Sequence, residues 1–144
     1  MSKGKFEFFE HTADIIIVAH GETLEEAFEN AALATFEVMT DTKKIEGESR
    51  ETVEVDGFDH EALLYNWIET LLVRFETTGN IYSEFTVKKI QKTDSGYKLK
   101  AILLGEKFDP KKHPSKVGVK AITYHRMKIT QTLHKSNVRF VLDI

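Results

Sequence analysis

The sequence contains no cysteine, which excludes disulfide bonds, zinc–thiolate centres and thiol nucleophiles. Any bound metal must therefore be held by carboxylates, histidines or main-chain oxygens. Such ligands favour calcium, magnesium or manganese over softer ions. Only two prolines are present, and both fall within residues 105–117, which we expect to form one irregular loop.

Long hydrophobic runs are also absent. No apolar stretch reaches the ~18 residues that a membrane-spanning helix needs, and residues 1–5 lack the apolar core of a signal peptide. We therefore expect a cytoplasmic protein with no membrane partner. The net charge of −3 argues against a general nucleic-acid binder, so direct DNA binding is not expected. With 144 residues, 41% of them hydrophobic, the chain should form a single domain over residues 1–144.

The usual signatures of a catalytic centre are missing too. There is no glycine-rich phosphate loop, no G-x-S-x-G elbow and no H-x-x-x-H metal spacing. No nucleophile and base can be assembled into a triad. The sequence therefore predicts that this chain is not a self-sufficient enzyme.

Two helices are predicted. Thr23 and Glu26 have the spacing of a capping box that opens the first helix, which presents small residues on one face and fades near Thr40. Asp59 is a good N-cap for the second, from about His60 to Phe75. Its apolar residues recur at intervals of three and four, which predicts one broad buried stripe.

The remaining segments indicate β-strands. The run 15–19 is continuously apolar and predicts an interior strand with both faces covered. The last two strands should form a hairpin because 133–137 resembles a turn. We expect an α+β fold, with two helices packed against largely antiparallel β-sheets in one compact domain. The predicted strands are 5–10, 15–19, 52–56, 85–90, 97–104, 120–125, 127–132 and 138–142.

Three anionic groups could form an oxygen site. Asp14 precedes the apolar run, and the apolar carboxy-terminal strand would hold Asp143 beside the terminal carboxylate of Ile144. Grouped anions repel, so they need a divalent cation or a lysine to coexist, and calcium accepts a flexible oxygen cage most readily. The alternatives are that Asp14 only caps a turn, and that Asp143 is a solvated charge.

Basic residues near the end of the chain offer weaker signals. Lys120 could neutralise carboxylates or reach a phosphate, or could be a solvated charge on a strand edge. In an extended strand, His125 and Lys120 point to opposite faces unless a bulge intervenes. His125 could equally be a hydrogen-bonded core histidine. The run 111–113 could contact nucleotide or RNA phosphates, or could form a solvated turn.

Five segments stand out in this order along the chain: His11-Thr12-Ala13-Asp14, Leu63-Leu64-x-x-Trp67-Ile68, Gly105-Glu106-x-x-Asp109-Pro110-x-x-His113, Val119-Lys120-Ala121-Ile122-Thr123-Tyr124-His125 and Arg139-Phe140-Val141-Leu142-Asp143-Ile144. Together they resemble the archease family over essentially the whole chain. Gly118 departs from the family pattern, where an acidic residue is common, and Asn137 departs where an aromatic is frequent. The first departure concerns any role of a carboxylate beside Lys120.

The resemblance implies an accessory protein of the RtcB-type tRNA-splicing RNA ligase, which reaches tRNA indirectly through that ligase. Such a protein promotes GTP-dependent guanylylation of the ligase, sustains multiple turnover and broadens nucleotide use. The resemblance also implies a calcium site at Asp14, Asp143 and Ile144, where Mn²⁺ or Mg²⁺ could substitute. Lys120, with His11 and His125, is a candidate for the ligase-activating surface.

Two other functions remain open from the sequence. One is a free-standing metal-dependent phosphohydrolase or nucleotidyl-transferring enzyme, against which the missing nucleophile and phosphate loop count. The other is a chaperone-like adaptor for tRNA-processing or modification enzymes, which would bind its partners without metal.

Overall fold

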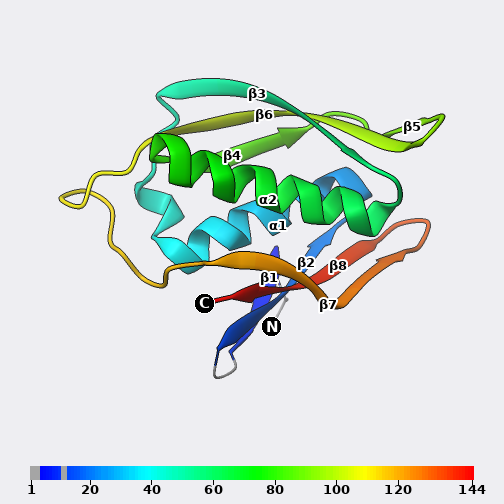
Figure 1. Cartoon of the computed structure of the whole chain (residues 1–144), viewed down its shortest axis with the longest axis horizontal. Helices are drawn as coiled ribbons and strands as arrows, with labels where there is room; N and C mark the ends of the chain where they lie inside the picture. Colours follow the sequence, from blue (N-terminus) through cyan, green and yellow to red (C-terminus); the bar gives the residue numbers. More distant parts are fainter. Residues whose placement is uncertain (1–3, 11–12) are drawn as a thin grey trace.

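The computed structural model describes residues 4–10 and 13–144. Two helices lie between two antiparallel sheets, so the chain is built in three layers (Figure 1). One sheet has the strand order β1-β2-β8-β7, and the other has the order β3-β6-β4 with β5 paired to β6. The predicted α+β class, with helices against antiparallel sheets, is confirmed. The strands are β1 (Phe6–Glu10), β2 (Asp14–Gly21), β3 (Ser49–Gly57), β4 (Asn80–Val87), β5 (Gln91–Thr93), β6 (Gly96–Lys107), β7 (Ala121–Gln131) and β8 (Ser136–Asp143).

Helix α1 (Leu24–Met39) is buried on most of its circumference because it packs against both sheets. Small side chains let the sheets approach it closely, and four of its alanines are fully buried. The predicted cap is present, since Thr23 Oγ1 accepts from the Glu26 amide at 3.1 Å. The Glu26 carboxylate accepts from the amide of Glu22 at 3.0 Å, one residue before the predicted position.

Helix α2 (His60–Thr78) begins and packs as predicted. The Asp59 carboxylate accepts from the Ala62 amide at 2.7 Å, and Gly79 ends the helix in the left-handed region with φ 78°. The fully buried Trp67 donates from its indole nitrogen to the Phe28 carbonyl at 2.9 Å, which ties α2 to α1. Among the described residues, no helix is long and apolar enough to cross a membrane.

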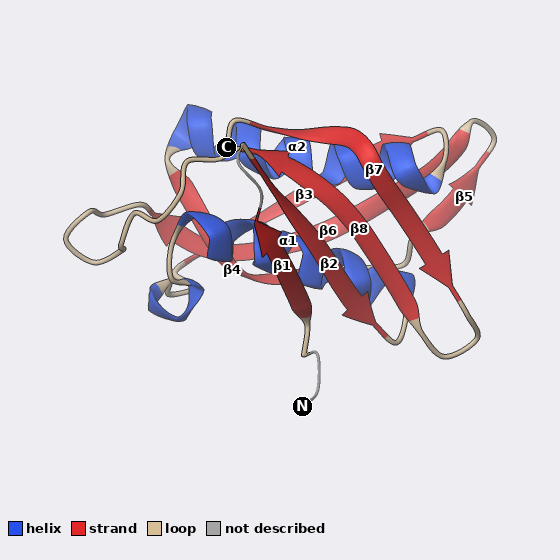
Figure 2. Cartoon of the chain, turned by 90° about the horizontal axis from the view of Figure 1, so that it is seen from below, coloured by secondary structure: helices blue, strands red, loops and turns tan. Residues whose placement is uncertain are grey.

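Four strand predictions need correction. The expected strand 85–90 is β4, which begins at Asn80 and ends at Val87, so residues 88–90 lie outside it. Strand β6 continues to Lys107, so Gly105 and Glu106 lie in a strand and the irregular connection covers only residues 108–120, here named the β6–β7 loop. The expected strands 120–125 and 127–132 are one strand, β7, interrupted by a bulge. Strand β2 is interior to its sheet, but Ile16 and Val18 are only half-buried. Its outer side faces away from the helices (Figure 2), so the expectation of two covered faces is wrong.

Candidate metal centre at the Asp14–Asp143 strand pair

Asp14 and Asp143 are direct partners in the antiparallel pairing of β2 with β8. The main-chain amide of Ile144 donates to the Ala13 carbonyl at 3.1 Å. Hydrogen-bonded and non-hydrogen-bonded pairs alternate along an antiparallel ladder, so the two aspartates form a non-hydrogen-bonded pair. Side chains approach most closely in such pairs, and the register therefore brings both carboxylates to one place.

Both carboxylates belong to the outer face of the sheet. Ile15 and Leu142, the next pair along, point into the core and are buried, so their neighbours on each strand point outward. Asp14 is half-buried and Asp143 is exposed. Like charges placed directly opposite one another destabilise a sheet, and no described residue forms an ion pair with either aspartate. A cation supplied from outside would relieve this repulsion.

The carboxy-terminal strand is held in the middle of its sheet, as the apolar sequence predicts. Strand β8 lies between β2 and β7, and the side chain of Ile144 packs against the hydrophobic core. On the other side, the Lys120 amide donates to the Asp143 carbonyl at 2.8 Å. The main chain at Asp143 is therefore fixed from both flanking strands.

The donor chemistry fits a hard divalent cation with an incomplete coordination shell. Asp14 and Asp143 would supply side-chain oxygens, and Ile144, the next residue after Asp143, would supply main-chain oxygen. Calcium takes six to eight oxygen ligands, so water or a partner would have to supply several. Within the described residues, no group of three or more His, Cys, Asp or Glu side chains could hold a metal by itself.

The other predicted site residues are placed differently. Lys120 is exposed and adjoins Asp143 through its main chain, although its ammonium forms no ion pair with a described residue. Ala121 is the β7 residue opposite Asp143, whereas His125 lies farther along, within the bulge. His125 is exposed, so the alternative of a core histidine is wrong. His11 lies outside the described residues.

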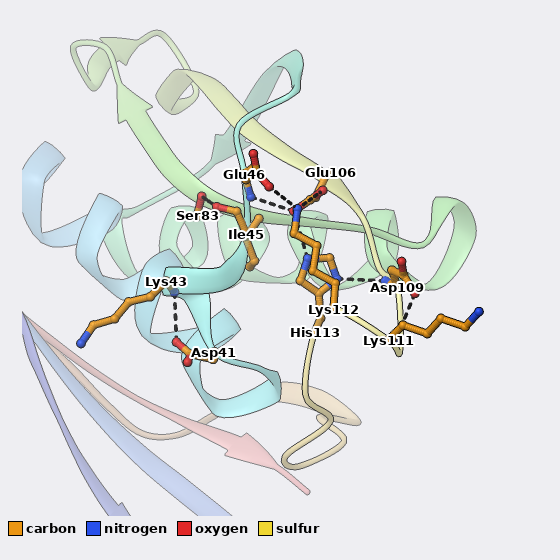
Figure 3. Close-up of polar contacts among 10 residues, drawn as sticks. All are labelled: Asp41, Lys43, Ile45, Glu46, Ser83, Glu106, Asp109, Lys111, Lys112 and His113. Atoms are coloured by element: carbon orange, nitrogen blue, oxygen red, sulfur yellow. Dashed lines mark hydrogen bonds and ion pairs between the residues drawn. The ribbon is translucent and has the colours of Figure 1, made fainter.

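A second polar cluster holds the β6–β7 loop against the end of β6 (Figure 3). The buried Glu106 carboxylate accepts from the Glu46 amide at 2.7 Å, from Lys112 Nζ and from His113 Nε2 at 3.0 Å. Lys112 also contacts the Glu46 carboxylate at 2.6 Å. Within the run 111–113, Lys112 and His113 point inward and are engaged, so these two are neither solvated nor free to contact a phosphate, whereas Lys111 is exposed on the turn.

The environment of Glu106 fixes its ionisation. Burial raises the pKa of this carboxyl, but hydrogen bonds from the Glu46 amide, Lys112 and His113 outweigh burial and hold its pKa at about 2. The same contacts with Glu106 and Glu46 raise the pKa of Lys112. The sequence indicated only a mixed-charge loop. The signal that could have found this cluster is an acidic residue at the end of an apolar strand, followed closely by a lysine and a histidine.

Comparison with known proteins matches nearly the whole chain to one family. Residues 6–144 match the model of the archease protein family (MTH1598/TM1083). The chain is 51% identical to a protein archease of Sulfurisphaera tokodaii over 140 residues, covering 97% of this chain and 99% of the relative. It is 53% identical to a protein archease of Pyrococcus abyssi over 125 residues, covering 87% of each chain.

Solved structures share the fold. The solution structure of protein 1598 from Methanobacterium thermoautotrophicum superposes with a TM-score of 0.82 at 40% identity, covering 97% of this chain and 99% of that one. The crystal structure of an archease from Thermotoga maritima, described as a possible chaperone, gives a TM-score of 0.62 at 19% identity and covers 94% of each chain. The second likeness concerns the fold alone.

Proposed function

The chain belongs to the archease family, and from that premise we propose that it is an accessory protein that activates an RtcB-type tRNA-splicing RNA ligase. In this role it promotes the metal- and GTP-dependent guanylylation of the ligase, sustains multiple turnover and broadens the nucleotides accepted. It reaches tRNA through the ligase and performs no catalysis of its own. Its place of action would be the cytoplasm.

The observation that supports this proposal most directly is the strand pairing of Asp14 with Asp143. Two carboxylates and the main-chain oxygen of Ile144 would hold a divalent cation, Ca²⁺ by preference and Mn²⁺ or Mg²⁺ as alternatives. The coordination shell of this cation would stay open on the solvent side. Groups of a partner protein or a nucleotide phosphate could then complete it. When bound, the cation would neutralise phosphate charge.

The protein's own residues would then position the cation and, through it, the triphosphate. Nucleotidyl transfer to a ligase side chain depends on alignment of the triphosphate and on charge neutralisation. Strand β8 fixes the main chain of Asp143 between β2 and β7, so the carboxylates are presented without a large ordering cost. Lys120 is exposed and adjoins Asp143 through its main-chain amide. His125 and His11 are further candidates for the activating surface.

A turnover assay tests the proposal. Ligase guanylylation and RNA joining are measured with RNA in excess over ligase, in the presence of the wild type, Asp143→Asn or Asp94→Asn. Asp94 is an exposed residue of the β5–β6 turn on the other sheet and serves as the matched control. We expect the wild type and Asp94→Asn to support many turnovers and Asp143→Asn to support few. Equal turnover with and without the wild-type protein would refute the activator role.

The alternative is a chaperone-like adaptor for tRNA-processing or modification enzymes. Exposed apolar side chains favour it, since Phe58, Leu133 and Phe9 are 75%, 89% and 51% exposed. These residues lie on different elements, which weakens the case for one continuous docking patch. An adaptor that works without metal predicts no rise of melting temperature with calcium, whereas the activator predicts one.

A further inference from the structure

The charges of this chain are separated along its length. Residues 110–142 contain eight lysines and arginines and no acidic residue, so all 23 acidic residues lie elsewhere. This segment includes the β6–β7 loop and nearly all of β7 and β8. The modest net charge therefore conceals a strongly basic part of the molecule, and strands β7 and β8 place much of it on one sheet.

Two of these cations lie side by side on the outer face of the sheet. Lys128 of β7 is the direct partner of Arg139 of β8, and neither forms an ion pair with a described residue. Like charges in this arrangement destabilise the sheet. The acidic residue nearest in this row is Glu7 on β1, which is engaged by His20 at 2.9 Å. Among the described residues, Lys128 and Arg139 thus lack an acidic partner that would offset their repulsion.

The pair borders a hollow suited to an anionic group. A shallow depression of about 170 Å³ is lined by Lys128, Arg139, Asn137 and Thr130, with Val18 and Val138. Two cations, an amide and a hydroxyl around a space of this size match the charge and the acceptor oxygens of a phosphate. The outer face of β7 and β8 is open in Figure 2, where no other element covers it.

An aromatic platform stands on the same strand. In the bulge of β7, Tyr124 is 52% exposed and stacks on Tyr65 of α2 with ring centroids 4.3 Å apart. Arg126 adopts φ 58°, a strained conformation for a residue with a side chain. Arg139 holds the bulge by donating from Nε to the Arg126 carbonyl at 2.9 Å. Arg139 therefore both lines the hollow and fixes the bulge that displays the Tyr124 ring.

We infer that the outer face and free edge of the β7–β8 hairpin bind single-stranded RNA directly. Phosphates occupy the hollow between Lys128 and Arg139, and a base stacks on the exposed face of Tyr124, as on other single-strand platforms. Arg126 extends the positive surface along the edge. This inference goes beyond the proposed function, which reaches RNA only through the ligase, and it takes RNA as the ligand class from that function.

An acidic protein segment is the competing ligand, and the aromatic platform argues against it. Cations alone would attract any polyanion, but the Tyr124 ring offers a flat surface that an acidic peptide does not need. Asp59 and Glu69 lie near Tyr124 on the α2 side and raise the pKa of its hydroxyl, after burial as the larger cause. The RNA backbone therefore follows the outer side of β7, away from α2.

Binding of the isolated protein to a fluorescent oligouridylate of about 12 nucleotides tests the inference without any ligase. Fluorescence anisotropy is measured from about 50 to about 200 mM KCl for the wild type, Lys128→Gln and Lys92→Gln. Lys92 is an exposed lysine on β5 of the other sheet and is the matched control. We expect Lys128→Gln to weaken binding and to reduce the salt slope by about 0.7, while Lys92→Gln matches the wild type.

Tyr124 variants separate RNA from other polyanions. We expect Tyr124→Ala to weaken binding by about 5- to 150-fold and Tyr124→Phe to retain it, because the ring and not the hydroxyl stacks. Binding that falls with Lys128→Gln but not with Tyr124→Ala would show attraction of any polyanion without base stacking and would overturn the RNA assignment. Undetectable wild-type binding, or equal binding of Lys128→Gln and Lys92→Gln, would overturn the site. Loss of ligase stimulation alone would leave these measurements unchanged.

Discussion

His113 donates from Nε2 to the Glu106 carboxylate at 3.0 Å in a buried contact that joins the β6–β7 loop to the strand before it. The Nδ1 atom of His113 accepts from the Asp109 amide at 2.9 Å, so the proton resides on Nε2 and the imidazole is neutral. The positive charge beside Glu106 comes instead from Lys112. This arrangement fixes the course of the loop that ends at Lys120.

The ionised Glu106 should make the protein sensitive to acid. Its folded-state pKa of about 2 lies below the usual value of 4.5, so the stabilisation is complete above pH 4.5 and is lost as the pH falls toward 2. We expect Glu106→Gln to lower the free energy of unfolding by about 2 kcal/mol at pH 7, because it loses charge-assisted hydrogen bonds. Urea unfolding of both proteins at several pH values measures this difference.

The test is the difference in free energy of unfolding between the wild type and Glu106→Gln. It should shrink as the pH falls below 4.5, because protonated Glu106 resembles the glutamine that replaces it. Glu54→Gln is the control, since Glu54 is an exposed residue of β3 that contacts Lys98 at 3.7 Å. A destabilisation by Glu106→Gln that stayed constant from neutral to acidic pH would contradict the ionised cluster.

Replacing Asp143 should have opposite effects on the stability of the protein with and without metal. In a chelating buffer, Asp143→Asn removes the repulsion from Asp14 and should stabilise the protein by several tenths of a kcal/mol. In wild-type protein, calcium at about ten times its dissociation constant should stabilise by about 1.4 kcal/mol. For a domain of this size, that corresponds to about 4–6 °C in melting temperature. Asp143→Asn should lose this response, and calorimetry in both buffers checks it.

Asp94→Asn is the matched comparison for that measurement. Asp94 lies in the exposed turn between β5 and β6, away from the β2–β8 pairing, so its variant should keep the full calcium response. A calcium-induced rise of the same size in Asp143→Asn would remove Asp143 from the metal site. The absence of any rise in the wild type would argue against the calcium site itself.

Much of this fold could be predicted because local patterns and tertiary packing agree. Thr23 and Asp59 begin the helices that their sequence context indicates, and Trp67 lies on the stripe that becomes the core. The aspartate pair could be anticipated as well, since two apolar strands carried Asp14 and Asp143 at matching ends. The strand register that makes them direct partners is a long-range property, and the structure was needed to establish it.

The features that could not be predicted depend on contacts between distant segments. Nothing local distinguishes Lys112, which turns inward to Glu106 and Glu46, from a solvated lysine in a loop. The β7 bulge arises because residues 124–127 of β7 lie opposite a single residue of β8 between flanking pairs. The overall net charge likewise obscured the basic β7–β8 hairpin, because charge averaged over a chain says nothing about its distribution.

Gly105 should tolerate no side chain. A Cβ atom added there would collide with the main chain of Ile81 and Tyr82 on the paired strand β4, at a point where the pairing of β4 with β6 is irregular. We expect Gly105→Ala to destabilise the protein by at least about 1–3 kcal/mol, because the backbone must move. Gly118 has no neighbour within 4 Å of such a Cβ, so Gly118→Ala should leave the urea midpoint unchanged. Equal midpoints for the two variants would contradict the close approach at Gly105.

Two buried threonines of the first helical segment should respond oppositely to the same substitution. Thr35 donates its hydroxyl to the Ala31 carbonyl at 2.9 Å, whereas the hydroxyl of Thr40, the C-cap of α1, has no hydrogen-bond partner among the described residues. Thr35→Val should therefore cost about 0.5–1.5 kcal/mol. Thr40→Val replaces an unpaired hydroxyl by a methyl group of similar shape and should be neutral or stabilising. Urea unfolding of both variants decides the point, since a clear loss of stability in Thr40→Val would show that its hydroxyl has a partner in solution.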